Sequence, residues 1–385
     1  MQIFGDRAHP VLEILEDLIR IPSVNPHYDG SSAGEIGIAD YLEHRFNNSA
    51  FSVTRQPVLP RRDNVIVELK TGHPDRVLLF EAHMDTVSFG SMLEPLTPLY
   101  REGKLFGRGS CDTKSTLAGM IYAMEQCALQ PELLNADLIL CASVDEEHAY
   151  RGLTAFMELN IPIAAAVVGE PTELSIVVEH KGCTRFLIRT HGKAAHSSVP
   201  SEGDSAIYQM VHVLRHIKEK IEPQLIESRT QLCGAATIAV GTISGGEEIN
   251  IIPEACEIKV DRRIIPGETP QQVLMDFESS LRNDVERYGV KLTIDPLLYD
   301  PALHTHHDAE VVKCAQKAAR ALGLKSELCG VPYGSNASKL QQYKGIPTIV
   351  YGPGSIAQAH SREEWVPVDG VIQAAEFYLR LAQTF

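Results

Sequence analysis

The chain has little basic charge and no paired cysteines, and each scarcity argues against a class of protein. Lysine and arginine number 35 against 50 acidic residues, so the formal net charge is −15. A protein without an excess of basic charge is poorly suited to neutralising rows of phosphates, which argues against nucleic-acid binding. The eight cysteines are scattered and form no Cys-x-x-Cys pair, which indicates reduced thiols. We therefore expect a cytoplasmic protein that binds no nucleic acid.

Long hydrophobic runs are also lacking. No apolar stretch approaches the roughly 20 residues that span a bilayer. The first residues, Met1–Arg7, show no basic segment followed by an apolar run, so no signal peptide is expected. The 385 residues, of which 44% are hydrophobic, are ordinary for a soluble protein of about two domains. We expect no association with a membrane.

The chain does contain a series of apolar strands that end in polar residues. Val77–Phe80 is a run of four apolar residues, typical of a buried strand, and His83 and Asp85 follow it. Asn64–Leu69 is predicted as a neighbouring strand. Residues two apart on a strand point the same way, so Asp85 can accept the second N–H of a metal-bound His83. A histidine that is hydrogen-bonded within the fold, beside an aspartate in a turn, would give the same pattern. A metal site therefore requires further ligands from other parts of the chain.

Four more chemically active side chains or clusters follow predicted strands or turns. Asp112 lies in a glycine-rich turn before a predicted helix, where it could be an ordinary N-cap or could hold metal through both oxygens. The apolar strand Ala136–Ser143 ends in Asp145-Glu146-Glu147, adjacent carboxylates that repel unless a cation lies beside them. Glu170 and His360 follow two further apolar strands. Ligands collect at the carboxyl ends of strands in open α/β sheets, so we expect these groups to converge.

The composition changes near residue 181, where a different domain begins. The predicted order over 181–294 is strand, helix, two strands, helix and strand, which is typical of a ferredoxin-like α+β sandwich. After residue 294, apolar strands and helices like those of residues 1–180 resume. We therefore predict an α/β protein: a discontinuous mixed-sheet α/β/α catalytic domain over 1–180 and 295–385, with the ferredoxin-like domain inserted at 181–294.

Two other patterns are weaker. Gly30–Gly34 matches the nucleophile-elbow pattern G-x-S-x-G, but a polar segment precedes it where an apolar strand is required. His304, His306 and His307 lie in a polar connection without an accompanying strand that carries a carboxylate. We interpret both as loop features, which argues against a serine hydrolase and against a metal site at the three histidines.

The convergent side chains suit a pair of divalent cations. Two imidazoles and several carboxylates favour borderline-soft ions, zinc most naturally, with cobalt or manganese as alternatives. Two-metal hydrolases share one carboxylate between ions about 3.5–4 Å apart, and one acid must stay free to accept a proton from water. Spacing alone does not assign these roles among six side chains: His83, Asp112, Glu146, Glu147, Glu170 and His360.

Nearly end to end, the chain resembles the zinc-dependent amidohydrolase family of acetylornithine deacetylase, succinyl-diaminopimelate desuccinylase, aminoacylase and glutamate carboxypeptidase. The resemblance is carried by the motifs HMDTV, GRGSCDTK, DEE, GEPT, AHSSVP and GPGSIAQAH. It implies that His83 and Glu170 bind one zinc, that Glu147 and His360 bind the second, and that Asp112 bridges both.

The same resemblance implies further roles. Glu146 would be the general base, Asp85 the partner of His83, and the peptide after Asp112 would be cis. His196 would be a lid histidine that reaches into the active site of the partner subunit, in a homodimer formed by the inserted domain. The resemblance also indicates substrate-binding positions, with Arg262 suited to a carboxylate: Arg262, Asn250 and Ser335.

The implied activity is hydrolysis of the amide bond of a small N-acyl amino acid, as in acetylornithine deacetylase. Alternatives are a desuccinylase-like, dipeptidase or carboxypeptidase activity at the same site, or an inactive binding or scaffold homologue. An inactive homologue would have lost the base or a ligand, and none is missing. Two departures concern specificity: Ser115 stands where relatives often have glycine, and Asn336 where many have aspartate, which removes a charge expected beside the substrate.

Overall fold

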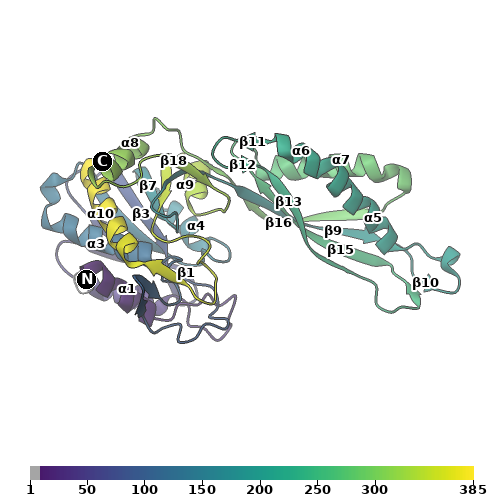
Figure 1. Cartoon of the computed structure of the whole chain (residues 1–385), viewed down its shortest axis with the longest axis horizontal. Coiled ribbons are helices and arrows are strands. Elements are labelled where there is room, and N and C mark those ends of the chain that lie inside the picture. Colours follow the sequence, from purple (N-terminus) through teal and green to yellow (C-terminus); the bar gives the residue numbers. More distant parts are fainter. Residues whose placement is uncertain (1–8) are drawn as a thin grey trace. The chain divides into compact units, whose positions relative to one another are not determined.

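The computed structural model describes residues 9–385. Met1–Arg7, for which no signal peptide is expected, lie outside the described residues. The chain divides into two compact units (Figure 1). The first takes in the chain up to Val178 together with Thr305–Cys329 and Ser335–Phe385, and the second comprises Glu179–His304 and Gly330–Gly334. The protein is a mixed α/β protein in which a ferredoxin-like unit interrupts the unit with the large sheet.

The first unit is built on a mixed sheet in the order β1-β2-β6-β3-β7-β19-β8. Strands β6, β3, β7 and β19 run parallel, whereas β1, β2 and β8 are antiparallel to their neighbours. Strand β6 lies between β2 and β3, so the prediction that these two strands are neighbours was wrong. The strands are β1 (Ser52–Leu59), β2 (Arg62–Leu69), β3 (Val77–His83), β6 (Asp137–Ser143), β7 (Ile163–Gly169), β8 (Ile176–His180) and β19 (Thr348–Tyr351).

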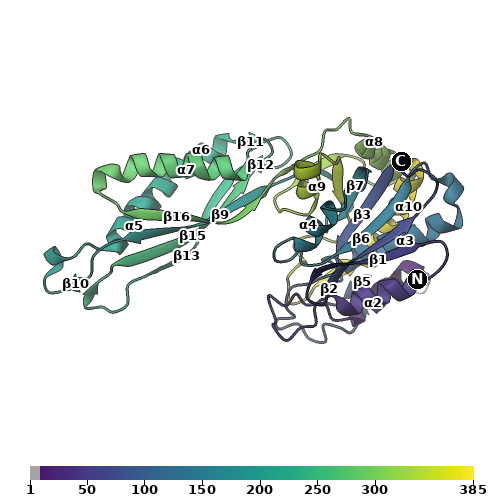
Figure 2. The same ribbon diagram turned by 180° about the vertical axis from the view of Figure 1, so that it is seen from behind.

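Helices cover both faces of this sheet. Figure 1 shows α1, α3 and α10 in front of the strands, and Figure 2, from behind, shows α4 and α9 in front. Strand β3 is therefore buried at every position, which explains why it is apolar rather than alternating. The helices of the unit are α1 (Pro10–Arg20), α2 (Ile36–Arg45), α3 (Lys114–Leu129), α4 (Arg151–Met157), α8 (Glu310–Ala321), α9 (Ala337–Lys344) and α10 (Val368–Thr384).

The parallel strands finish together. In the β3–β6 ladder His83 pairs with Ser143, the last residue of each strand. Gly169 ends β7 and pairs with Tyr351 at the end of β19. Because parallel strands end at the same edge of a sheet, the residues that follow them are brought to one place.

The second unit has a four-stranded antiparallel sheet in the order β13-β15-β9-β16. With two helices in the crossings, this is the predicted ferredoxin-like arrangement. Helix α5 continues through a π-helical turn, Ile217–Ile221, into α6, so one helical stretch runs from Ala206 to Glu227. The elements are β9 (Gly182–His191), α5 (Ala206–His216), α6 (Glu222–Glu227), β13 (Thr237–Gly245), β15 (Ala255–Ile264), α7 (Pro270–Val285) and β16 (Leu292–Asp300).

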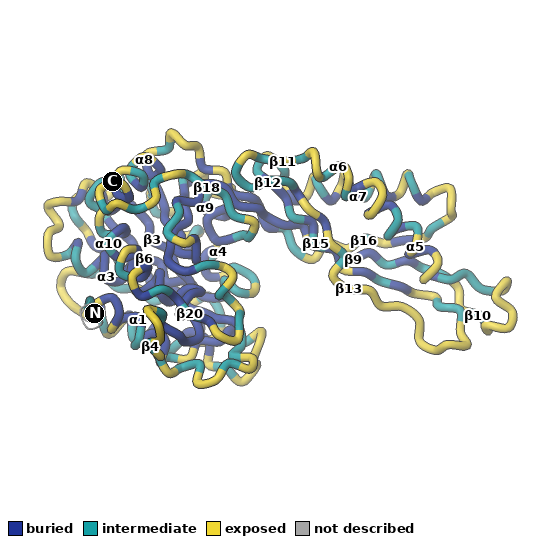
Figure 3. The backbone as a smooth tube through the Cα atoms, in the orientation of Figure 1, coloured by how far each residue is buried: buried dark blue, intermediate teal, exposed yellow. Residues whose placement is uncertain are grey.

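Burial along the chain follows these elements (Figure 3). Apolar side chains of α5 and α7, such as Met210 and Phe277, pack on Phe186 and Ile258 of the second unit's sheet. No helix within residues 9–385 has the length and apolar character needed to cross a membrane. The short strands are β4 (Leu99–Arg101), β5 (Lys104–Phe106), β10 (Ala195–His196), β11 (Arg229–Thr230), β12 (Gly234–Ala235), β14 (Ile251–Ile252), β17 (Leu303–His304), β18 (Leu328–Val331) and β20 (Trp365–Pro367).

Candidate metal centre

Five segments of the first unit bring polar side chains to the edge where the parallel strands end. His83 is the last residue of β3, Asp112 lies in the loop before α3, and Glu147 follows β6. Glu170 directly follows β7, and His360 lies in the loop after β19. The sequence therefore predicted the convergence of these five side chains, four from the ends of strands and Asp112 from the turn before a helix.

Asp112 faces both imidazoles. Its Oδ1 lies 3.2 Å from His83 Nε2 and its Oδ2 lies 3.3 Å from His360 Nε2. His83 Nε2 is also 4.0 Å from Glu170 Oε1, and His360 Nε2 is 3.2 Å from Glu147 Oε1. Two groups of three result, His83–Asp112–Glu170 and Asp112–Glu147–His360, each with ligand atoms within 4.8 Å of one another. One carboxylate is thus shared between two sets of donors.

The N-cap alternative for Asp112 does not hold in the structure. Helix α3 begins after Thr113, which is its N-cap residue and makes no capping hydrogen bond through its side chain. The Asp112–Thr113 peptide is cis, as the resemblance implied. The carboxylate of Asp112 is buried against the two imidazoles rather than bonded to the start of the helix.

The tautomer of His83 follows from its hydrogen bonds. Its Nδ1 lies 2.9 Å from the main-chain carbonyl oxygen of Asp85, and a carbonyl can only accept, so Nδ1 carries the hydrogen. Nε2 is then the nitrogen that faces Asp112 and Glu170, and it would bind a metal ion through its lone pair once it has given up its proton. The predicted acceptor was the Asp85 carboxylate, whose Oδ1 lies farther away, at 3.5 Å.

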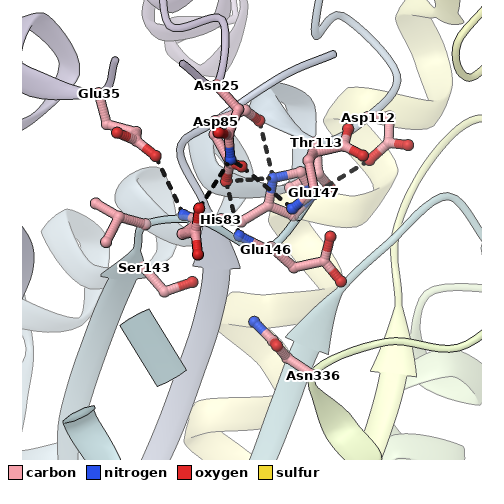
Figure 4. A network of polar contacts seen from close by, with 12 residues as sticks. Asn25, Glu35, His83, Asp85, Asp112, Thr113, Ser143, Glu146, Glu147 and Asn336 are labelled. Atoms are coloured by element: carbon pink, nitrogen blue, oxygen red, sulfur yellow. Dashed lines mark hydrogen bonds and ion pairs between the residues drawn. The ribbon is translucent and has the colours of Figure 1, made fainter. Parts of the chain in front are cut away.

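The Asp85 carboxylate instead holds the turn after β6 (Figure 4). Its Oδ1 accepts a hydrogen bond from the amide N–H of Glu146, and its Oδ2 accepts one from the amide N–H of Glu147, each at 3.1 Å. Asp85 therefore connects His83 to the two glutamates. Glu147 belongs to one donor group, whereas Glu146 belongs to neither.

The electrostatics of the cluster reflect an excess of buried negative charge. Burial alone would lower the pKa of His83, but its contact with Asp112 leads to a pKa well above the usual value. The hydrogen bond with Asp112 raises the pKa of His360 to about 11. Burial raises the pKa of Glu146 to about 8 and that of Glu170 well above its usual value. A divalent cation bound among these groups would favour the ionised carboxylates and lower their pKa values.

The donor set fits a pair of divalent cations. Two imidazoles and three carboxylates offer five ligand groups in two overlapping sets, and zinc accepts both nitrogen and oxygen donors. His83, Asp112 and Glu170 are buried, so the charge of these carboxylates would be costly without a partner. The second group is more open, because the side chain of His360 is 51% exposed.

Three predicted residues lie in the second unit, apart from this cluster in the chain. His196, in β10, is exposed, and its Nδ1 lies 2.7 Å from the hydroxyl oxygen of Ser198. Asn250 is exposed just before β14, which pairs with β10. Arg262 is buried, and its guanidinium donates to Glu268 Oε1 at 2.7 Å. The roles of these residues toward a substrate stay predictions.

Two polar residues at the start of α9 are fully or almost fully buried. The hydroxyl oxygen of Ser335 accepts the amide N–H of Ala337 at 3.2 Å, and its substrate role stays a prediction. Asn336, one of the two departures that concern specificity, donates from its Nδ2 to Glu81 Oε1 at 2.9 Å. Asn336 therefore belongs to a polar contact in the interior of the unit, because β3 presents Glu81 to it there.

The weaker patterns have ordinary surroundings. Gly30–Gly34 lies in turns between α1 and α2 with no preceding strand, so the nucleophile-elbow pattern has no structural counterpart. His306, His307 and Asp308 lie close enough to share an ion, but all three are exposed. Asp308 is also paired with Lys313 at 3.0 Å, and no second observation points to a ligand there.

Two functional neighbours of the cluster were not predicted from the sequence. Asn25, in the loop after α1, donates to Asp85 Oδ2 at 2.8 Å. Glu364, four residues after His360, accepts the amide N–H groups of Gly109, Cys111 and Asp112, each at 2.9 Å. Both residues hold in place loops that carry candidate metal ligands. Their partners are distant in the sequence or are main-chain groups, so no local pattern marks them.

Comparisons with known proteins agree with this geometry. Residues 79–384 match the model of peptidase family M20/M25/M40. The acetylornithine deacetylase of Myxococcus xanthus is 30% identical over 91% of this chain and 92% of its own. The solved aminopeptidase PepT of Bacillus cereus has a TM-score of 0.79 at 20% identity, with 97% and 98% of the two chains covered.

A dinuclear metal binding peptidase of the M20 family from Bacillus subtilis has a TM-score of 0.72 at 16% identity, covering 97% of this chain and 96% of that one. At these identities the solved structures establish the fold, whereas the family model spans most of the chain. The chain therefore belongs to peptidase family M20/M25/M40, a family of metallohydrolases.

Proposed function

We propose that the protein hydrolyses the amide bond of N-acyl amino acids, in the manner of an acetylornithine deacetylase, with two divalent cations, zinc most naturally. The observation that carries the proposal is the shared Asp112 carboxylate, whose oxygens face His83 and His360 while Glu146 remains outside both donor groups. The Myxococcus xanthus relative, similar over 91% of this chain, supports the deacetylase assignment.

The residues that would hold the cations are the two donor groups. His83 and Glu170 would bind one ion, Glu147 and His360 the other, and Asp112 both. When bound, the pair supplies a Lewis acid for the amide carbonyl and lowers the pKa of a water molecule toward neutrality. The Bacillus subtilis neighbour, a dinuclear metal binding peptidase, supports two ions rather than one.

Glu146 then acts as the proton carrier. It accepts a proton from the attacking water and delivers it to the departing amine. Its amide N–H is held by Asp85, so the start of its side chain is fixed relative to His83. A base must be free of metal to do this. Asp145 and Glu146 both stand outside the donor groups, but Asp145 is paired with Arg62 and Arg151, which leaves Glu146.

The inserted unit would bind the substrate and complete the site across a homodimer. His196 would donate a hydrogen bond to the developing oxyanion, where a fixed donor stabilises the transition state. Arg262 and Asn250 of this unit, together with Ser335 of the first unit, would contact the amino-acid portion of the substrate. Because Arg262 already pairs with Glu268, a substrate carboxylate would have to compete for that guanidinium.

A hydrolysis panel tests the proposal. The purified enzyme is loaded with zinc or cobalt and offered N-acetyl, N-succinyl and N-formyl amino acids together with dipeptides. We expect hydrolysis of N-acyl amino acids that a strong chelator abolishes and added zinc restores. Activity that survives complete chelation contradicts the metal mechanism. Cleavage of dipeptides alone would favour the peptidase alternative, to which the fold shared with the Bacillus cereus aminopeptidase lends support.

A further inference from the structure

The loop that follows α1 contacts the metal centre although it lies outside the residues that match the family model, 79–384. This loop, Ser23–Tyr28, is anchored to the chain just beyond β3: the amide N–H of Asn25 donates to Thr86 O at 2.9 Å, and that of Thr86 donates to Ser23 O at 3.0 Å. The sequence alone suggested only that this polar segment ends α1. The structure places it against the turn that carries Glu146 and Glu147.

Asn25 is the central contact of this loop. It is completely buried, and its Nδ2 donates to two carboxylates, Asp85 Oδ2 at 2.8 Å and Asp145 Oδ1 at 3.1 Å. Its Oδ1 accepts the amide N–H of His27 at 3.0 Å. Figure 4 shows Asn25 beside Asp85, opposite the glutamates.

The chemistry of the position explains why asparagine is needed. Two buried carboxylates close to each other repel, and an amide nitrogen can give one hydrogen to each. A serine has a single hydrogen to donate, and an aspartate would add a third negative charge. Asp145 is the first residue of the turn that continues into Glu146 and Glu147, and Asp85 accepts the amide N–H groups of both glutamates.

The rest of the loop contacts the same turn. The hydroxyl of Tyr28 donates to the carbonyl oxygen of Glu147 at 2.9 Å. The His27 ring is stacked on that of His148, with centroids 3.8 Å apart and planes at 12°. The loop thus contacts the turn at three residues, Asp145, Glu147 and His148.

We propose that Asn25 is a positioning residue of the hydrolytic site, acting through Asp85 and Asp145 to hold Glu146 in place for proton transfer and Glu147 in place to bind metal. This inference rests on the proposed function for the role of Glu146. The effect on metal binding, through Glu147 and His83, is independent of the substrate.

The test compares Asn25→Asp and Asn25→Ala with a control that only loosens the fold. Val312→Ala is suitable because Val312 is fully buried on α8, where the neighbouring Glu310 pairs with Arg76 at the opposite end of β3 from His83. Tyr28→Phe is a milder fourth variant that removes one hydrogen bond at an exposed position. For each we measure kcat and KM on the best substrate of the panel, Co²⁺ affinity by chelator competition, and the thermal midpoint.

Removing a partner that orients metal ligands costs about 10- to 100-fold in affinity or activity. We expect Asn25→Asp to lower kcat by about that factor, with KM changed less than about threefold, and to weaken Co²⁺ binding about tenfold. Val312→Ala should lower the thermal midpoint while kcat and Co²⁺ affinity stay within about twofold of wild type.

Values of kcat and Co²⁺ affinity within about twofold of wild type in both Asn25 variants would overturn the proposal, whatever their thermal midpoints. If the Asn25 variants do not fold, Tyr28→Phe tests the proposal in their place. It should lower kcat by about threefold, and an unchanged kcat would contradict a positioning role for the loop. If the wild type hydrolyses nothing on the panel, the proposed function fails, and the Co²⁺ affinities still decide the role of Asn25.

Discussion

Glu146 and Glu147 are adjacent in the chain but have different partners, and this difference predicts different losses. Glu147 lies 3.2 Å from His360, whereas Glu146 joins neither donor group. We expect Glu146→Gln to keep both metal ions and to lower kcat by about 10²- to 10⁴-fold, because the amide cannot carry the proton. Metal content by elemental analysis, measured beside kcat on the same sample, checks this.

Glu147→Gln is the matched comparison, one residue along and the same change. It should lose metal from the more exposed donor group, and added zinc should restore part of its activity. If Glu146→Gln instead loses metal, or keeps normal turnover, the assignment of base and ligand within the turn is wrong.

Polar side chains at the ends of buried strands could be found from the sequence, because a run of apolar residues followed by a polar residue is a local pattern. His83, Glu147 and Glu170 were found in this way. Asn25 and Glu364 were missed because they act on groups far away in the chain. A sequence pattern also does not show whether the main chain or the side chain of a residue makes a contact. His83 demonstrates this, because it bonds to the main-chain carbonyl oxygen of Asp85 rather than to its carboxylate.

At the scale of single elements, the start of β6 offers a pH-dependent prediction. Asp137 Oδ1 accepts the amide N–H groups of Thr71 and His73. Partial burial alone would raise the pKa of Asp137, but these bonds outweigh it and hold the pKa below the usual value. The ionised form is therefore favoured in the folded protein, and its contribution to stability is present above pH 4 and is lost as the pH falls through the lowered pKa.

We expect Asp137→Ala to reduce the free energy of unfolding by about 1 kcal/mol at pH 7, a modest value because the side chain is only partly buried. The difference from wild type should shrink as the pH is lowered below 4. Urea unfolding of both proteins at a series of pH values checks the sign. A difference that grows on acidification would contradict the assignment.

Elements with strong periodicity were predicted well, and elements defined by pairing were not. The features that mark helix α1 are local, because a proline begins it and apolar residues recur at helical spacing. Strand β1 was missed because it is an edge strand without a buried position.

At the scale of the whole molecule, the insertion and its ferredoxin-like order were predicted from the sequence of elements. The compact second unit, however, includes residues on either side of 181–294, and also Gly330–Gly334. These additions depend on packing: β16 runs on to Asp300, and His304 pairs with Glu179. Such contacts join residues that are distant in the chain, so composition cannot locate them.

The second unit also presents a surface suited to a second copy of the chain. Ile207 and Tyr208 on α5 line a groove of about 420 Å³ with residues 245–253, and Ile249 beside it is fully exposed. Strand β13 is an edge of the sheet, with its second half exposed and open to pairing. Apolar side chains beside an unpaired strand edge are typical of an interface rather than of a solvated surface.

We expect Tyr208→Glu to convert a dimer to a monomer, because a charge would be buried at the contact. Met275→Glu is the control, since Met275 is an exposed apolar residue on α7 of the same unit. Sedimentation velocity at several concentrations distinguishes the two. A monomeric wild type, or dimers in both variants, would show that this face is not the interface.

A heterodimer decides whether the two subunits complete each other's sites. Glu146→Gln and His196→Ala should each lower turnover by about 10²-fold or more as homodimers. If His196 of the partner subunit serves each site, a heterodimer with one variant per subunit contains one fully wild-type site and one doubly impaired site. Such a heterodimer, isolated with two affinity tags, should therefore recover about half of the wild-type rate per dimer.

If His196 acts within its own subunit, each site carries one defect and the heterodimer stays as inactive as its parents. The comparison is internally controlled, because each of the three species carries one substitution per subunit, and only the pairing of the subunits differs.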